Sequence, residues 1–295
     1  MQFDFDFQRY VDQRRNPNTR GTAEGTYAPY AYSTDLRVLR TLSYARPVRI
    51  AAEATVRAFK AWVQSDLLGN SVRVSQRQFP HLHNIVAECA ERLSIPVPTV
   101  YVYQNFASIN AATYGTEADS FILINSATVD KLTPQELKFV IGHECGHIQN
   151  SHVTYMTALH FVTNVGGMIV RSISLPARIA LQQWSRAAEI TCDRAGLLCV
   201  DDVDVAVSTM VRLAVGSRQL AEDIDIDEYL AQLEGIRSGV GRVSEYMSSH
   251  PYLPKRVRAL HLFAQSDYYQ SRTGGEGGRP LHEIDQEVDR VVKVL

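Results

Sequence analysis

Hydrophobic residues recur at two spacings along this chain, and the spacings separate helical from extended segments. Short runs rich in branched and aromatic residues predict three strands, at about 98–104, 108–114 and 120–125. Longer stretches with apolar residues three and four positions apart predict helices. These are expected at about 47–66, 79–93, 134–151, 176–199, 203–218, 226–238, 254–267 and 281–295. A few strands among many helices indicate an α+β fold, mainly helical, with a small antiparallel or mixed sheet.

The same pattern divides the chain into three parts. Residues 1–66 form an N-terminal extension, irregular up to about residue 45 and ending in an amphipathic helix. Residues 67–267 form the main domain. Residues 268–295 contain a glycine-rich stretch at 274–278, which predicts a flexible linker, and then the last amphipathic helix.

The helix predicted at 134–151 has a well-defined start. Thr133 can cap it, Pro134 suits its first position, and Glu136 can complete a capping box. Its buried face would consist of apolar residues at helical spacing: Leu137, Val140, Ile141 and Ile148.

The third and fourth turns of this helix contain a His-Glu-Cys-Gly-His motif. His143 and His147 are four residues apart and therefore share one helical face. Both imidazoles can then bind one zinc ion, with Glu144 beside the metal as general base. We expect one zinc ion per chain.

A catalytic zinc site needs a third protein ligand and an open fourth position. Glu189 is the best candidate, and Asp193 lies four residues later on the same helix face. Asp193 could accept the free ring N–H of a ligand histidine. Arg186 or Arg256 could pair with Asp193 or with another buried acid. Without the histidine motif, Glu189 and Asp193 would be read as a solvated acidic face.

At this point the chain resembles the gluzincin metalloendopeptidases, the family that includes the protease HtpX and the CAAX prenyl protease. The resemblance runs from about residue 67 to 260 and rests on blocks in matching order: 69–80, 96–102, Asn110-Ala111, 143–152, 185–193 and His250-Pro251. Cys192 stands where alanine is usual in the family.

The resemblance implies a zincin-like metallopeptidase domain at 67–267, with the sheet beside the metal helix. It suggests His250 as the donor that stabilises the oxyanion during peptide hydrolysis. It also implies that Asn110, Ala111 and Ala112 lie on an edge strand that binds substrate by β-addition. The function expected is a zinc-dependent endopeptidase acting on extended or unfolded polypeptides. The alternative is a latent or non-catalytic zinc module that binds clients or partners.

The net charge and the cysteine content bear on the binding partner and on the cellular compartment. The formal net charge of -2 gives no overall attraction to nucleic acid. The four cysteines, Cys89, Cys145, Cys192 and Cys199, show no zinc-binding spacing and are interpreted as free thiols. Free thiols indicate a reducing compartment, so we expect a cytoplasmic protein. Nothing in the sequence indicates an oligomeric state.

The hydrophobic stretches are too short or too polar to cross a membrane. The richest one, residues 155–170, contains His160 and Asn164 and falls short of the ~20 apolar residues required. No integral membrane segment is therefore predicted. The amphipathic stretch at 47–63 has the pattern of a packed helix, and contact with a membrane surface is the alternative interpretation.

Overall fold

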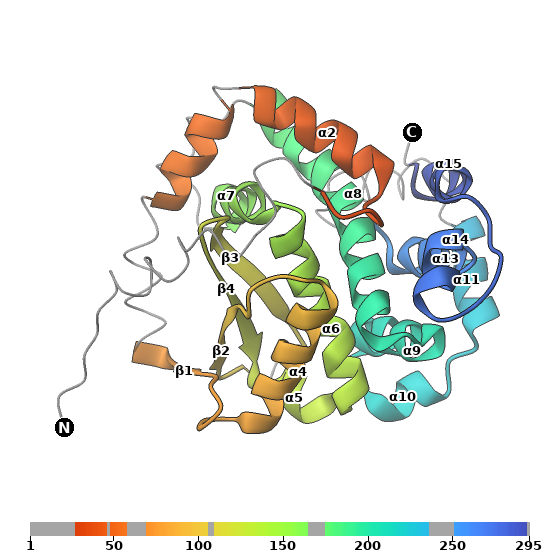
Figure 1. Ribbon diagram of the computed structural model, residues 1–295, viewed down its shortest axis with the longest axis horizontal. Helices are drawn as coiled ribbons and strands as arrows, with labels where there is room; N and C mark the ends of the chain where they lie inside the picture. Colours follow the sequence, from red (N-terminus) through yellow and green to blue (C-terminus); the bar gives the residue numbers. More distant parts are fainter. Residues whose placement is uncertain are drawn as a thin grey trace.

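The computed structural model describes residues 27–45, 48–57, 69–105, 109–164, 175–235 and 251–293. A four-stranded sheet lies beside a larger group of helices (Figure 1). Its strands are β1 (Ser71–Arg73), β2 (Thr99–Tyr103), β3 (Ala111–Thr116) and β4 (Asp119–Asn125), in the order β1-β2-β4-β3. The β2–β4 pair is parallel and the other two pairs are antiparallel. This confirms the predicted α+β class, with a small mixed sheet that has β3 at one edge.

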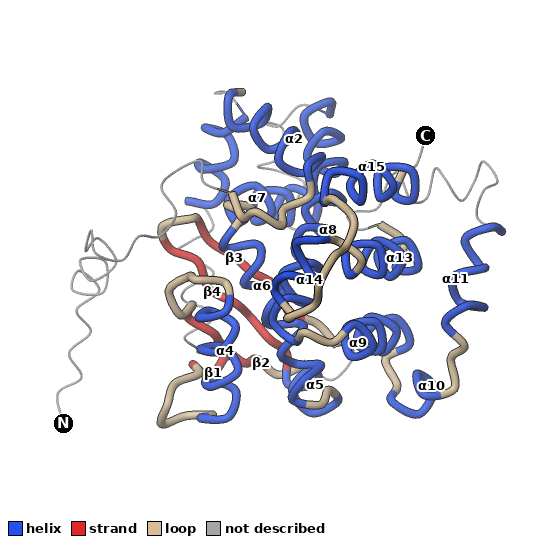
Figure 2. Tube along the Cα trace, turned by 45° about the vertical axis from the view of Figure 1, so that its right-hand side comes forward, coloured by secondary structure: helices blue, strands red, loops and turns tan. Residues whose placement is uncertain are grey.

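Two helices, α6 (Pro134–Gln149) and α8 (Leu175–Val200), form the centre of the fold (Figures 1 and 2). Glycines allow their close approach. A Cβ atom on Gly142 would lie 2.8 Å from Cys199 Sγ, and one on Gly146 would lie 2.7 Å from Ala195 Cβ. The two helices are therefore held at a separation that a larger side chain would increase.

The start of α6 is the one expected from the sequence. The Thr133 hydroxyl accepts from the Glu136 N–H at 3.3 Å, and Glu136 Oε2 accepts from the Thr133 N–H at 2.7 Å. Glu136 Oε2 also lies 2.7 Å from Arg212 Nη1, a contact that links α6 to α9 (Val203–Val215).

The remaining helices surround this pair. Helix α4 packs against α6, α7 packs on β3, and α13 packs against α8 and α9. Helices α7, α5 and α14 lie in segments for which no helix was predicted. The bounds are α4 (Pro80–Arg92), α5 (Ser126–Lys131), α7 (Val153–Asn164), α10 (Arg218–Glu222), α11 (Ile226–Gly235), α13 (Leu253–Ala264) and α14 (Asp267–Arg272). Residues 48–57 are also helical.

The expectation of irregular structure up to residue 45 is wrong for the described part of the extension. Helix α2 (Ser33–Tyr44) packs along α8. The Arg194 guanidinium donates to the Tyr30 carbonyl at 3.0 Å, and the Tyr32 N–H donates to Thr191 Oγ1 at 3.1 Å. The N-cap residue Tyr32 makes no side-chain cap, and the acidic residue in the first turn is Asp35.

The glycine-rich stretch forms a hydrogen-bonded turn, and its flexibility as a linker stays a prediction. Gly274, Gly277 and Gly278 have positive φ angles. The turn is closed by backbone hydrogen bonds between Asp267 and Arg279, 2.8 Å, and between Arg279 and Gln265, 2.9 Å. It places α15 (Leu281–Val292) against α13 and α2. The division of the chain at 66 and 267 remains a prediction, but the described parts of both ends pack on the central helices.

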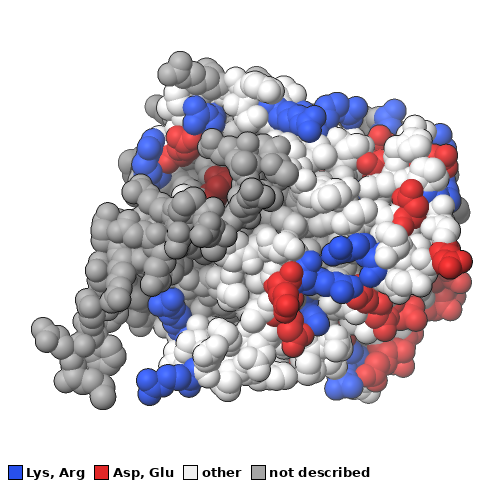
Figure 3. Space-filling view, in the orientation of Figure 1, with Lys and Arg blue, Asp and Glu red and all other residues white. Residues whose placement is uncertain are grey.

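No helix among the described residues combines the length and apolar character needed to cross a bilayer. On the face shown in Figure 3, basic and acidic side chains both occur, in separate small groups. This distribution agrees with a formal net charge of only -2.

Candidate metal centre

His143, His147 and Glu189 face one another between α6 and α8. The Nε2 atom of His143 lies 3.6 Å from Glu189 Oε2, and that of His147 lies 3.6 Å from Glu189 Oε1. All three side chains are buried. Tetrahedral zinc with bonds of about 2.1 Å separates its ligand atoms by about 3.4 Å. Two imidazole nitrogens and a carboxylate at these distances fit a zinc ion.

Cys192 is a second candidate for the third ligand. Its Sγ lies within 4.8 Å of ligand atoms of His143 and His147. Burial and the nearby Glu189 charge raise the pKa of this thiol well above its usual value, which disfavours the thiolate that binds zinc. Glu189 presents one oxygen to each imidazole, so we consider it the better ligand.

Asp193 and Arg256 contact the side chains of His143 and Glu189 and hold them in position. His143 Nδ1 lies 3.0 Å from Asp193 Oδ1, which leaves Nε2 free to face Glu189. Arg256 donates two hydrogen bonds to Asp193, of 2.6 and 2.8 Å, and its Nη1 lies 3.0 Å from Glu189 Oε2. Of the two arginines considered as supports, Arg256 makes this contact. A supporting role for Arg186, one helical turn before Glu189, stays a prediction.

The charges around the site move the pKa values of the two histidines in opposite directions. Burial disfavours protonation of both. At His143 the hydrogen bond to Asp193 and the Glu189 charge outweigh burial, so the pKa is raised. At His147 burial dominates and the pKa is lowered. Burial also disfavours the charged form of Asp193, but Arg256 and His143 outweigh this and lower its pKa. Asp193 is thus an ionised acceptor at neutral pH.

Glu144 lies beside the metal ligands and is held by the sheet. The Thr113 hydroxyl lies 2.6 Å from Glu144 Oε2 and donates to it. Thr113 belongs to β3, so the edge strand and the metal helix meet at the candidate general base. Thr113 is not among the residues predicted from the sequence, although it follows directly after the three residues proposed to bind substrate.

A cavity of about 400 Å³ connects the candidate metal ligands with the edge strand. Asn110, Ala111 and Ala112 line one side of it, and their role in binding substrate stays a prediction. β3 pairs with β4 along one edge, and α7 reaches the far end of its other edge, where the Gly115 N–H donates to Thr157 Oγ1 at 3.1 Å. Apolar side chains from three helices complete the lining: Phe139, Val140, Met156, Leu159 and Leu213.

The comparison with known families agrees with this geometry. The profile of Peptidase family M48 matches residues 76–263, more than half of the chain and including both central helices. The chain belongs to peptidase family M48. It is thus a member of a metallopeptidase family, as the resemblance in its motifs implied.

Several curated proteins are similar to this M48 chain. The plastoglobule-localized metallopeptidase 48 from the chloroplast of Arabidopsis thaliana is 31% identical, over 69% of this chain and 62% of its own length. An HtpX protease homologue of Moorella thermoacetica is 25% identical, over 65% of this chain and 75% of its own. Another, from Methanosarcina acetivorans, is 25% identical over 64% of each. The match thus spans less than two thirds of the Arabidopsis protein. No solved structure gives a significant match.

His250, the candidate oxyanion donor, lies outside the described residues. Its role in this M48 chain stays a prediction. The described residues that follow it include Arg256, which reaches the metal ligands from α13.

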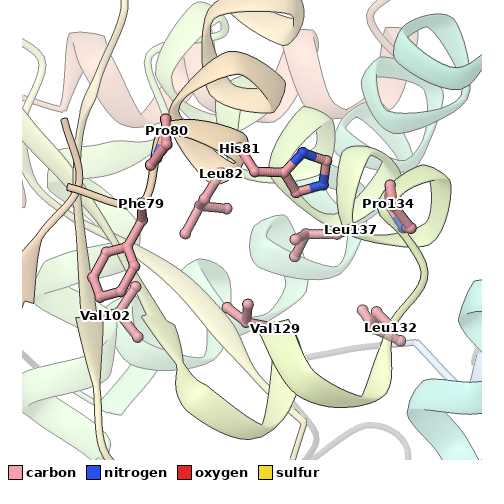
Figure 4. Close-up of a pocket in the computed structure, with 9 residues that line it drawn as sticks. All are labelled: Phe79, Pro80, His81, Leu82, Val102, Val129, Leu132, Pro134 and Leu137. Carbon is pink, nitrogen blue, oxygen red and sulfur yellow. The ribbon is translucent and has the colours of Figure 1, made fainter. Parts of the chain in front are cut away.

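A second cavity, of about 270 Å³, lies where α4 and α6 begin beside β2 (Figure 4). Its lining includes no carboxylate and one histidine, His81, which gives it no set of metal ligands. The lining residues are Phe79, Pro80, His81, Leu82, Val102, Val129, Leu132, Pro134 and Leu137. The chemistry therefore favours the cavity beside His143 as the functional site.

Proposed function

We propose that this M48 chain is a zinc-dependent endopeptidase that hydrolyses peptide bonds of extended or unfolded polypeptides. The observation that carries the proposal is the convergence of His143, His147 and Glu189, with Glu144 beside them. Three protein ligands leave a fourth position for water, which is the arrangement of catalytic zinc sites. Structural zinc sites are usually closed by four ligands.

The chemistry that zinc supplies when bound is the activation of a water molecule, whose pKa falls to ~7. Glu144 takes a proton from the attacking water and later gives it to the leaving amine. The Thr113 hydroxyl donates to Oε2 of Glu144, and each carboxylate oxygen still has a lone pair that can take this proton. Asp193 orients the ring of His143, and Glu189 would remain a metal ligand and take no part in proton transfer.

The edge strand suggests how substrate is bound. An extended peptide can lie along the edge of β3 beside Asn110, Ala111 and Ala112 and add a strand to the sheet. The backbone of Asn110 itself is already paired, since its N–H donates to Thr128 Oγ1 at 2.8 Å and its carbonyl accepts from the Asn125 N–H at 3.2 Å. Backbone pairing depends little on sequence, which suits unfolded polypeptides. The apolar side chains in the cavity would contact the substrate residues beside the cleaved bond. His250 is the proposed donor to the oxyanion.

The first test is zinc content by elemental analysis, in wild type, His147→Ala and the control His81→Ala. We expect close to one zinc per chain in wild type and His81→Ala, and little in His147→Ala. A folded wild type that takes up no added zinc would contradict the proposal.

The second test is cleavage of an unfolded protein such as reduced casein. Glu144→Gln should retain zinc and lose hydrolysis, because an amide cannot accept the proton. Retained hydrolysis in this variant would exclude Glu144 as the base. Zinc binding without hydrolysis in wild type would favour the latent or non-catalytic module.

The compartment is a separate proposal. All four cysteines are buried and unpaired, which fits a reducing compartment, and we keep the cytoplasm as the expected one. The name of the Arabidopsis relative places that protein in the chloroplast, so it gives no support for the cytoplasm.

A further inference from the structure

Two buried polar residues, His152 and Asp35, follow His147 in a row of side-chain contacts that leads away from Glu189. His147 Nδ1, on the side of the ring away from Glu189, lies 3.2 Å from His152 Nδ1. His152 Nε2 lies 3.0 Å from Asp35 Oδ2. Both His152 and Asp35 are fully buried, with 0% exposure. A line of contacts therefore runs from the metal ligand to a carboxylate on α2.

Two further donors fix the carboxylate of Asp35. Trp184 Nε1 donates to Oδ1 at 2.8 Å, and Thr191 Oγ1 donates to Oδ2 at 2.6 Å. Burial disfavours the charged form, but His152 and these hydrogen bonds outweigh it and lower the pKa of Asp35. An ionised carboxylate is negatively charged and only accepts hydrogen bonds, so it favours the ring proton of His152 on Nε2, the nitrogen 3.0 Å away.

This arrangement sets the tautomers of both rings. His152 Nε2 lies 3.0 Å from Asp35 Oδ2, which is an ion-pair distance, but it makes no hydrogen bond of suitable geometry among the described residues. The Asp35 charge still favours a proton on this nitrogen. A neutral His152 with its proton on Nε2 has a lone pair on Nδ1. That lone pair can accept the Nδ1–H of His147, which leaves the Nε2 lone pair of His147 facing Glu189. The tautomer that results is the one a metal ligand requires.

Cys192 is the other neighbour of this nitrogen. Its Sγ lies 3.6 Å from His152 Nδ1. A thiol is a weak donor, whereas an imidazole N–H at 3.2 Å is an ordinary one. The imidazole contact is thus the one that orients His152.

We propose that His152 and Asp35 are positioning residues, which fix the ring orientation and tautomer of His147 as Asp193 does for His143. The proposal rests on the proposed function, because it assumes that His147 binds zinc. It adds a contribution from outside the matched region. Asp35 precedes residue 76, where the family match begins, so α2 completes the metal site of this chain.

The test uses Asp35→Asn, which keeps the size of the side chain and removes its charge. Asp285→Asn is a matched control. Asp285 is also buried, and it also joins α2 to α8, since it accepts from the Ser33 N–H at 2.9 Å and from Arg194 at 2.6 Å. In the structure described here, Asp285 contacts none of the proposed metal ligands. Zinc affinity is measured by competition with a chelator, and the Tm of the metal-free protein reports on folding.

Asp35→Asn should weaken zinc binding about 10–100-fold, the usual effect of losing a group that orients a ligand. Asp285→Asn should lower the Tm and leave zinc affinity within about 3-fold of wild type. Unchanged affinity in a folded Asp35→Asn protein would overturn the proposal. So would equal losses of affinity in the two variants, because they would indicate a general structural effect. Zinc binding by wild type is measured first, so failure of the proposed function is recognised separately.

A measurement on wild type keeps the proposal testable if Asp35→Asn does not fold. Two-bond ¹H–¹⁵N correlation spectra of histidine-labelled, zinc-loaded protein report which ring nitrogen carries the proton. We expect the proton on Nε2 of His152 and on Nδ1 of His147. A His152 ring protonated on Nδ1 alone would exclude the proposed line of hydrogen bonds.

Discussion

Thr113 and Glu144 are joined by a hydrogen bond of 2.6 Å between the edge strand and the metal helix. The same hydroxyl lies 3.2 Å from the backbone carbonyl oxygen of Glu144. One threonine thus fixes the candidate base relative to the strand on which we expect substrate to bind. The register of the sheet and the position of the base are coupled through this side chain.

Replacing Thr113 with valine should slow hydrolysis without removing zinc. The variant keeps the shape of the side chain but loses a hydrogen bond to a charged group, worth about 1.5–3 kcal/mol. We expect kcat/KM to fall about 10–100-fold, with zinc content unchanged. Thr209→Val is the control, since Thr209 is a buried threonine whose hydroxyl bonds to the Val205 carbonyl. Equal activity of Thr113→Val and wild type would show that Glu144 does not depend on this contact.

Removing Arg256 should destabilise the metal-free protein. Arg256→Ala would leave Asp193 and Glu189 buried without the guanidinium that pairs with both. Breaking a buried pair in this way costs about 3–5 kcal/mol, which urea unfolding can measure. Excess zinc should restore part of the loss, because it binds the folded state.

The control for Arg256 is an exposed ion pair. Arg279 lies 2.9 Å from Glu287, and its side chain is 41% exposed. Arg279→Ala should change the free energy of unfolding by no more than about 1 kcal/mol. If Arg256→Ala costs as little as this control, the buried pair does not carry the stability assigned to it.

The contact between α6 and α8 should not tolerate a methyl group at Gly146. The added Cβ would lie 2.7 Å from Ala195 Cβ and would force the helices apart. Overpacking of this kind costs about 1–3 kcal/mol. Zinc affinity should also fall, because the histidines and Glu189 lie on different helices. The double variant Gly146→Ala/Ala195→Gly should recover part of both losses, and no recovery would show that this pair of atoms is not the cause.

The stabilising effect of Asp35 should disappear in acid. Its folded-state pKa lies below the ordinary value of 3.8. Between these two values the unfolded chain binds a proton that the folded chain does not, so stability rises with pH. The difference in unfolding free energy between wild type and Asp35→Asn should be largest above pH 3.8 and shrink as the pH falls further. A difference that stays constant down to pH 2 would mean that the Asp35 charge does not stabilise the fold.

Local patterns were sufficient to predict the metal helix. The Thr133–Glu136 capping box and the four-residue spacing of His143 and His147 involve neighbours within one or two helical turns. Such contacts depend on helix geometry alone, and the structure has them as expected. Glu189 was expected near both histidines from the motif together with the second helix, and it lies 3.6 Å from each.

Contacts across long sequence separations could not be predicted in the same way. Asp35 is 149 residues from Trp184 and 156 from Thr191, and its buried environment depends on how α2 packs on α8. The Thr113 contact depends on the register of β3 against α6. The turn at 274–278 depends on backbone hydrogen bonds from Asp267 to Arg279 and from Arg279 to Gln265, which the glycine content does not reveal.

Because of Asp35, the segment of this chain that matches the family differs from the segment that forms the proposed metal site. Comparison of sequences delimits a unit at 76–263, whereas the hydrogen bonds from Trp184 and Thr191 and the 3.0 Å contact from His152 end on a residue far before it. A fragment cut at the limits of sequence similarity would contain every proposed metal ligand and lack the acceptor behind one of them. The segment that identifies the family is therefore shorter than the segment that we expect to bind zinc tightly, because the latter must also include Asp35.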